Sequence, residues 1–175
     1  MSSNFEFFKK QVELTGKHAR MARELWQRDH QEATYFKRLI DLYKMAPAVG
    51  YLSERKAVKD SGTEETATIF LEQINREKEF LENIMTMILM AEYADSGLYK
   101  KEEAVKEAFR GPQTQEAYEQ CVEIFESYVR GGIEVLYEEL VLKQSIYENR
   151  YSSHRNTGAL MGFLEQWGLS EEANT

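Results

Sequence analysis

The sequence predicts an all-α fold: a single compact multi-helix domain, without a sheet, around a central apolar helix at about residues 76–93. Hydrophobic residues recur at three- and four-residue steps through most of the chain, as in helices that bury one face. The chain contains only two prolines, Pro47 and Pro112, so few positions oppose helix formation through a missing amide hydrogen. Between residues 84 and 91 only Thr86 is polar, and a helix that is apolar on every side must be covered on every side.

Length and composition place this domain among globular proteins. A chain of 175 residues is long enough for one domain, 1–175, with a sizeable core. The fully apolar run is far shorter than the roughly 20 residues that cross a bilayer, so we expect no membrane contact. The first ten residues carry no apolar leader, and Cys121 is the only cysteine. We therefore expect a cytoplasmic protein without an intrachain disulfide.

The first half of the chain predicts helices separated by one polar loop. Residues 1–15 have a helix-compatible pattern and form either a short docking helix or a mobile arm. Amphipathic helices are expected at residues 17–28 and 33–46, and Pro47 should end or bend the second. The polar run at residues 53–66 is expected to be a surface loop.

In the second half, Thr66 or Thr68 is expected to cap a helix that continues into the central one. Residues 100–111 predict a short helix with Val105 and Phe109 facing inward. Residues 114–147 predict one long helix, or two in line. The tail, residues 148–175, is peripheral and contains a short amphipathic C-terminal helix at residues 159–169.

A glycine pair lies in the middle of the long helix. Gly131 and Gly132 each cost about 1 kcal/mol against alanine in a helix interior, so their presence needs a reason. A kink or a close approach of another backbone would supply one. We expect a close helix crossing in the core, with Arg130 and Glu134 left outside. The predicted partner-binding residues are Arg130, Gly131, Gly132 and Glu134.

Charge is distributed unevenly along the chain. Residues 1–60 hold 12 Lys and Arg against 8 Asp and Glu, a net charge of +4, and residues 61–175 hold 10 against 22, a net of −12. The two halves attract each other within one fold, or the charges simply form solvated faces. The alternative is that the basic third contacts nucleic acid or an acidic partner. The residues that would make such contacts are Lys17, Arg20, Arg23, Arg55, Lys56 and Lys59.

Motifs for catalysis and metal binding are absent. His18, His30 and His154 lie far apart and outside any Glu-x-x-His or His-x-x-x-His arrangement, which argues against a di-iron or zinc site. The sequence has no P-loop, no G-x-G-x-x-G and no G-x-S-x-G element. Cys121 falls on an apolar stripe and is expected to be buried. We predict no catalytic residue, metal or cofactor, although catalytic groups assembled only by the fold remain the alternative.

Three blocks of the sequence resemble a known protein family. They are LIDLYKMAPAVGYLSERK (39–56), EEAVKEAF (102–109) and FESYVRGGIEVLYEEL (125–140). Together they resemble the small proteins associated with DNA phosphorothioation (Dnd) systems, and the resemblance covers residues 33–142. Ser53 and Glu54 depart from the more basic turn of that family.

The resemblance implies a context rather than a reaction. Relatives accompany genes that replace an oxygen of the DNA backbone by sulfur, and restriction genes that act against foreign DNA. The resemblance implies a non-enzymatic accessory or assembly subunit of a bacterial anti-phage system. Such a subunit would bind larger protein subunits. Formation of a homo-oligomer and direct contact with DNA are both left open. One alternative is a DNA-binding accessory that uses the basic N-terminal third, and another is an acidic regulator that mimics the charge of DNA.

Overall fold

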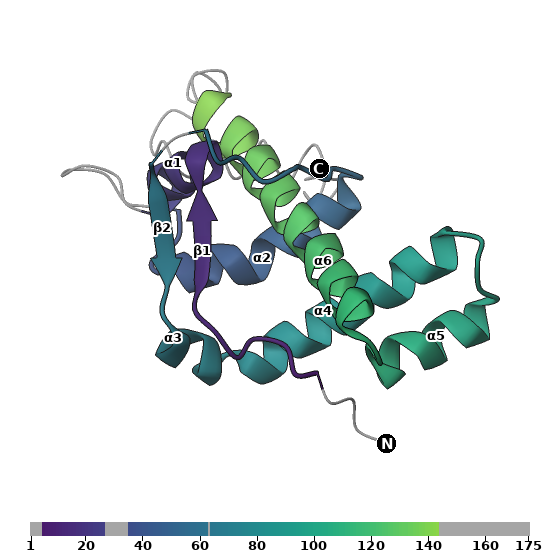
Figure 1. Ribbon diagram of the computed structural model, residues 1–175. Coiled ribbons are helices and arrows are strands. Elements are labelled where there is room, and N and C mark those ends of the chain that lie inside the picture. The colour runs from purple at the N-terminus through teal and green to yellow at the C-terminus, as the bar shows by residue number, and fades with distance from the viewer. Residues whose placement is uncertain (1–4, 27–34, 63, 144–175) are drawn as a thin grey trace, which may run out of the picture.

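The computed structural model describes residues 5–26, 35–62 and 64–143 of the chain (Figure 1). Within these ranges the fold is mainly helical, as the sequence predicts, with one small sheet. In chain order the elements are β1 (Val12–Thr15), α1 (Gly16–Trp26), α2 (Leu39–Leu52), β2 (Thr66–Ile69), α3 (Leu71–Arg76), α4 (Lys78–Asp95), α5 (Lys101–Arg110), α6 (Gln115–Tyr137) and the π-helix η1 (Glu138–Leu142).

The centre of the fold is the crossing of α2 and α6. Helix α6 runs diagonally across the molecule with α2 behind it (Figure 1). Seven consecutive residues of α6, 127–133, are buried, so this part of the helix is covered on every side. Full enclosure defines the core of a helical domain, and it falls here rather than at residues 76–93.

Helix α4 is therefore not the central helix that the sequence predicted. Met87 lies in the middle of its apolar run and is 63% exposed, whereas Leu81, Met85 and Leu89 face the core. The apolar run is hydrophobic enough to suggest full enclosure, but one of its faces remains open to solvent. Hydrophobic side chains at the surface are common in globular proteins, so an apolar run alone did not locate the core.

The prediction of a fold without a sheet is wrong, because the structure contains a two-stranded antiparallel sheet. Strand β1 pairs with β2, with Val12 opposite Ile69 and Leu14 opposite Ala67. Leu14, Ala67 and Ile69 are buried, which follows the two-residue period of strands. Residues 12–15 are therefore not helical, and Thr66 and Thr68 lie in β2 instead of capping a helix.

Helix α2 contains Pro47 instead of ending before it. It begins only at Leu39, because Arg38 is still extended, and it continues to Leu52. A proline inside a helix loses one hydrogen bond and costs about 3 kcal/mol. Burial of Ala46, Val49 and Gly50 against α6 offsets that cost, since tertiary packing contributes more to helix stability than local propensity.

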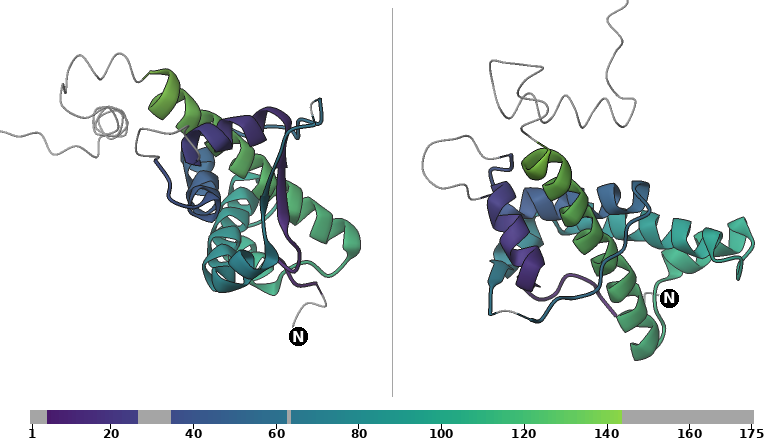
Figure 2. Two further views of the ribbon diagram at one scale, coloured as in Figure 1. Left: turned by 90° about the vertical axis from the view of Figure 1, so that its left-hand side faces the viewer. Right: turned by 90° about the horizontal axis from the view of Figure 1, so that it is seen from above.

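Helices α4 and α5 form an antiparallel hairpin that projects away from the strands (Figure 2). Gly111 ends α5 with φ of +71°, as its position after the helix predicts. The predicted orientation of α5 is wrong, because Ala104 and Ala108 face inward while Val105 and Phe109 point outward. The small alanines allow α5 to lie close to α4.

Helix α6 is one continuous helix through the glycine pair. Thr114 caps its start by accepting a hydrogen bond from the amide of Ala117 at 3.1 Å. Neither Gly131 nor Gly132 has a positive φ. The helix then continues as η1, where the amide of Lys143 donates to the carbonyl of Glu138. The close-crossing prediction is confirmed, and a break at the glycines is excluded.

Three glycines allow α2 and the segment that follows it to lie against α6. A Cβ added to Gly132 would overlap the carbonyl of Ala46, and one added to Gly50 would overlap the carbonyl of Tyr128. At Gly131, the added atom would meet the carbonyl of Arg55, in the segment that follows α2. In each case the obstacle is backbone, which cannot swing aside.

The predicted C-terminal helix at 159–169, the tail at 148–175, and His30 and His154 lie outside the described residues.

We predict that Gly132→Ala destabilises the protein by at least about 2 kcal/mol, because the methyl group would force α2 and α6 apart. Chemical denaturation followed by circular dichroism measures this. Gly62→Ala is the matched control, because only the Asp60 side chain lies near its added Cβ, and it should change stability by less than about 0.5 kcal/mol. Equal stability of Gly132→Ala and the wild type would contradict the close crossing.

Candidate functional site

The residues predicted to bind a partner are enclosed by the protein's own chain. Gly131 is covered by the backbone at Arg55, and Gly132 by α2. Their small size is used within the fold, which leaves no room there for an external helix. The expectation that Arg130 lies outside is wrong, because its side chain is buried. The Glu134 side chain is partly exposed, at 16%, and is paired within the chain.

Arg130 of α6 forms a hydrogen bond with the segment after α2. Its side chain is only 8% exposed. Its Nε donates to the carbonyl of Ala57 at 2.7 Å, and its Nη2 donates to Glu123 at 2.5 Å. The amide of Ala57 in turn donates to the carbonyl of Ser127 at 3.0 Å. A buried charge must be paired and hydrogen-bonded, and these contacts meet that requirement.

Glu134 of α6 forms ion pairs with two residues of α1. The same carboxylate oxygen lies 2.8 Å from Lys17 Nζ and 2.9 Å from His18 Nε2. Burial opposes ionisation of this carboxyl group, but the hydrogen bonds from Lys17 and His18 outweigh it and lower the pKa of Glu134. Burial also lowers the pKa of His18, against the raising effect of Glu134. The ring is thus held in its neutral form near neutral pH.

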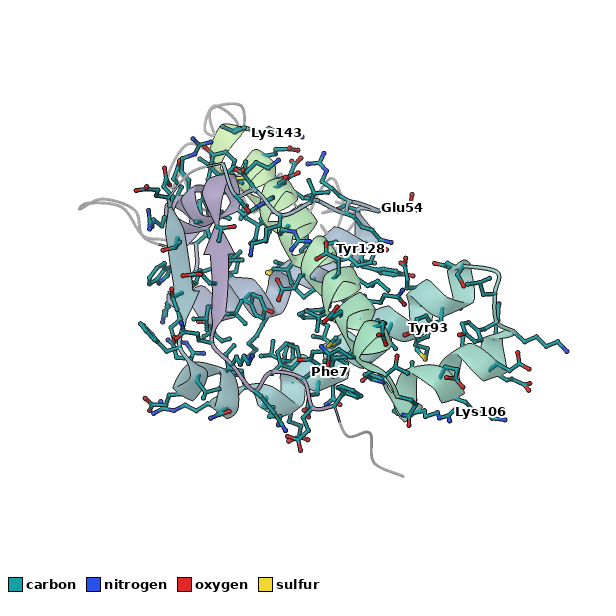
Figure 3. The ribbon with its side chains drawn as sticks, viewed as in Figure 1. Phe7, Glu54, Tyr93, Lys106, Tyr128 and Lys143 are labelled. Atoms are coloured by element: carbon teal, nitrogen blue, oxygen red, sulfur yellow. The ribbon has the colours of Figure 1, made fainter. Side chains whose placement is uncertain are left out.

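The basic residues of the loop after α2 contact acidic residues of the second half of the chain. Arg55 donates to Glu138 at 2.7 Å, and Lys56 donates to Glu92. Tyr128, labelled in Figure 3, donates its hydroxyl hydrogen to the other oxygen of Glu92 at 2.7 Å. Burial of Glu92 opposes its ionisation, yet these two donors keep its pKa below the ordinary value.

The six predicted basic residues therefore do not form one free surface. Arg23 donates to the carbonyl of Thr66, and Lys17, Arg55 and Lys56 form ion pairs. Within the described ranges, Arg20 and Lys59 have no ion pair and are exposed. Attraction between the basic and acidic parts of one fold accounts for most of this charge pattern.

The hairpin of α4 and α5 exposes several apolar side chains that lie close together in the sequence. Leu98 is 81% exposed, Val105 40% and Phe109 74%. Val105 and Phe109 are four residues apart and share one side of α5. Sequence reasoning missed them because large apolar side chains are normally assigned to the core, while the alanines at 104 and 108 carried no comparable signal.

A second feature lies at the base of this hairpin. A cavity of about 420 Å³ opens between α4, α5 and the start of α6. Tyr93, Leu98, Tyr99, Cys121 and Ile124 contribute its apolar lining. Tyr93 lies beside α6 in Figure 3, and its hydroxyl is 3.3 Å from the sulfur of Cys121, which is buried as predicted. Together, the exposed apolar residues of the hairpin and this cavity offer both a projecting surface and a hollow.

Two further observations concern cofactors and membranes. In the part of the chain that the structure describes, no three His, Cys, Asp or Glu side chains are gathered so as to hold a metal ion. None of the described helices has the length and apolarity needed to cross a bilayer. The absence of a metal from the working protein stays a prediction.

The fold and these contacts define a compact, mainly α-helical domain that carries a small two-stranded sheet. The chain belongs to the family described as DNA sulphur modification system-associated protein 4, whose model matches residues 11–154. This confirms the resemblance to Dnd-associated proteins. No curated protein and no solved structure matches the chain.

We predict that His18 makes the protein less stable in mild acid. Its folded-state pKa lies below its ordinary value of 6.5, so the unfolded chain takes up a proton at higher pH than the folded one. The neutral ring's contribution is therefore present above about pH 6.5 and falls as pH drops below it. Urea unfolding at pH 7.5 and 5.5 should show a larger loss for the wild type than for His18→Gln. Equal losses would mean that the folded protein accepts this proton readily.

Proposed function

We propose that this protein is a non-enzymatic accessory or assembly subunit of a DNA sulphur modification system and acts through protein–protein contacts. Its partners would be larger subunits of that system, in the cytoplasm of a bacterium that uses it against phage DNA. The single observation that carries the proposal is the exposed apolar surface of the projecting α4–α5 hairpin. Family membership supports the biological context.

The hairpin has the features of a docking element. Single exposed apolar residues are ordinary, but Leu98, Val105 and Phe109 lie within twelve positions on one projection. Burying each would contribute about 1.5–3 kcal/mol. Large aromatic side chains such as Phe109 commonly dominate the energy of an interface when they fill a partner's pocket. The expected partner surface is accordingly an apolar groove that accepts one side of α5.

The distribution of charge supports a protein partner over DNA. Affinity for DNA requires lysines and arginines that are free to neutralise phosphates. Lys17, Arg55 and Lys56 instead pair with Glu134, Glu138 and Glu92 of the same chain. A DNA-binding function would have to rely on the smaller number of lysines and arginines that have no ion pair within the described residues.

We predict that Phe109→Asp abolishes binding to a partner while leaving the fold intact, because residue 109 is 74% exposed and a charge there would oppose burial in an apolar groove. The experiment co-expresses the chain with each protein encoded beside it in a sulphur modification gene cluster and measures copurification. Circular dichroism checks the fold. Val58→Asp, at a position 81% exposed in the loop after α2, should keep the partner.

Salt dependence separates the two classes of partner. An apolar interface should persist across about a tenfold rise in salt, whereas phosphate contacts weaken steeply. Retention of every partner by Phe109→Asp would contradict the proposed surface, and a salt-sensitive association with DNA alone would contradict the proposed class of function.

A further inference from the structure

A second cavity lies beneath the N-terminal segment. It measures about 470 Å³ and is lined by residues 6–15 and Lys59, by one residue each of α1, α2 and α4 (His18, Tyr43 and Met85), and by residues of α6 between Tyr118 and Arg130. The N-terminal segment runs in front of α2 and α4 toward the lower end of α6 (Figure 1). Phe7, which belongs to this segment, lies near that end of α6 (Figure 3). A volume of 300–1,000 Å³ is typical of small-molecule sites.

Aromatic rings form one wall of the cavity. Phe7 stacks on Tyr118 with ring centroids 5.2 Å apart and an interplanar angle of 12°. Phe8 meets Phe125 edge-on at 5.6 Å. All four of these residues line the cavity. Phe5 also stacks on Tyr118, with ring centroids 5.6 Å apart, so part of this wall is already covered by the protein's own rings. The rest of the aromatic lining favours a planar, polarisable ligand.

Polar groups with unused hydrogen-bonding capacity lie on the other walls. Arg130 uses Nε and Nη2, but its Nη1 makes no hydrogen bond within the described chain. His18 is 1% exposed, and its Nδ1 is the one buried side-chain nitrogen or oxygen of the described residues that has no partner. Because Nε2 faces the Glu134 carboxylate, Nε2 carries the ring hydrogen and Nδ1 is an acceptor.

A carboxylate completes the polar set. Glu126 accepts the hydroxyl hydrogen of Tyr43 at 2.5 Å on one oxygen, and its other oxygen has no hydrogen bond within the described residues. Burial raises the pKa of Glu126, and the Tyr43 hydrogen bond only partly opposes that rise. The cavity thus offers a donor at Arg130 and acceptors at His18 and Glu126. A ligand that satisfies all three must carry donors and acceptors together.

Three lysines, Lys9, Lys10 and Lys59, are among the residues that line the cavity. Lys9 pairs with Glu6 at 3.2 Å, whereas Lys10 and Lys59 are exposed and have no ion pair among the described residues. Glu13 and Glu123 also line the cavity, and Glu123 is paired with Arg130. The inner part is therefore nearly balanced in charge, and the two free lysines favour an anionic group near them.

We propose that this cavity binds a nucleoside monophosphate, with its base against the aromatic wall and its phosphate at Lys10 and Lys59. A nucleobase is planar and bears donors and acceptors on its edges, which matches Arg130, His18 and Glu126. Stacking on aromatic side chains contributes binding energy for any base. The ligand is either a free nucleotide or a terminal nucleotide of single-stranded DNA, because both present the same chemistry.

Calorimetric titration of the full chain tests the site. Free nucleoside monophosphates form one arm and short 5′-phosphorylated oligonucleotides the other. At least one ligand should bind saturably, and Lys10→Ala combined with Lys59→Ala should weaken it about tenfold by removing charge-assisted contacts. Lys106→Ala is the matched control, because Lys106 is exposed on α5 far from the cavity (Figure 3). It should bind as the wild type does.

Nitrogen NMR supplies a readout that needs no change to the cavity. In a His30→Gln, His154→Gln protein only His18 contributes imidazole signals, and its Nδ1 signal should move as nucleotide is added. The absence of saturable binding by every ligand would overturn the proposal. Binding that the two lysine substitutions do not weaken, or that leaves the Nδ1 signal unchanged, would overturn it as well. Neither substitution touches the hairpin, so failure here is distinguishable from failure of the proposed function.

Discussion

The close contact between the backbones of α2 and α6 is the constraint on which the rest of the structure depends. It exists because Gly50 and Gly132 present no side chains where the helices cross. Dense packing at this point lets Val129, Ile133 and Leu136 bury their side chains fully or nearly so. The position of α6 then determines where every other element can attach.

The electrostatic contacts are arranged around this crossing. Arg130 holds the segment after α2, and Glu134 holds α1 through Lys17 and His18. These groups join parts of the chain more than 70 residues apart in sequence. Exposed ion pairs contribute little to stability, but paired charges that are largely buried fix one arrangement, because breaking them leaves a charge unpaired. Outside this network, the α4–α5 hairpin exposes Leu98, Val105 and Phe109 within twelve positions.

The sequence predicted the features that depend on local chemistry. The mainly helical class, the stop at Gly111, the burial of Cys121 and the close crossing at Gly131 and Gly132 all follow from residue pattern and size. It did not predict features set by tertiary contacts. Strands of four residues pair across about fifty positions, and Pro47 is tolerated because α2 is buried. Burial of Arg130 depends on Ala57 and Glu123, which no local pattern connects to it.

Hydrogen exchange measured by mass spectrometry tests most directly whether the crossing is the most stable part of the fold. Local stability is highest where backbone hydrogen bonds are enclosed by packed side chains. We expect the amides of Ala46, of residues 48–50 and of residues 128–136 to exchange slowest, with those of α5 exchanging well before them; Pro47 has no amide hydrogen. Slower exchange across residues 84–91 of α4 than across the middle of α6 would contradict this account and return the centre of the fold to α4.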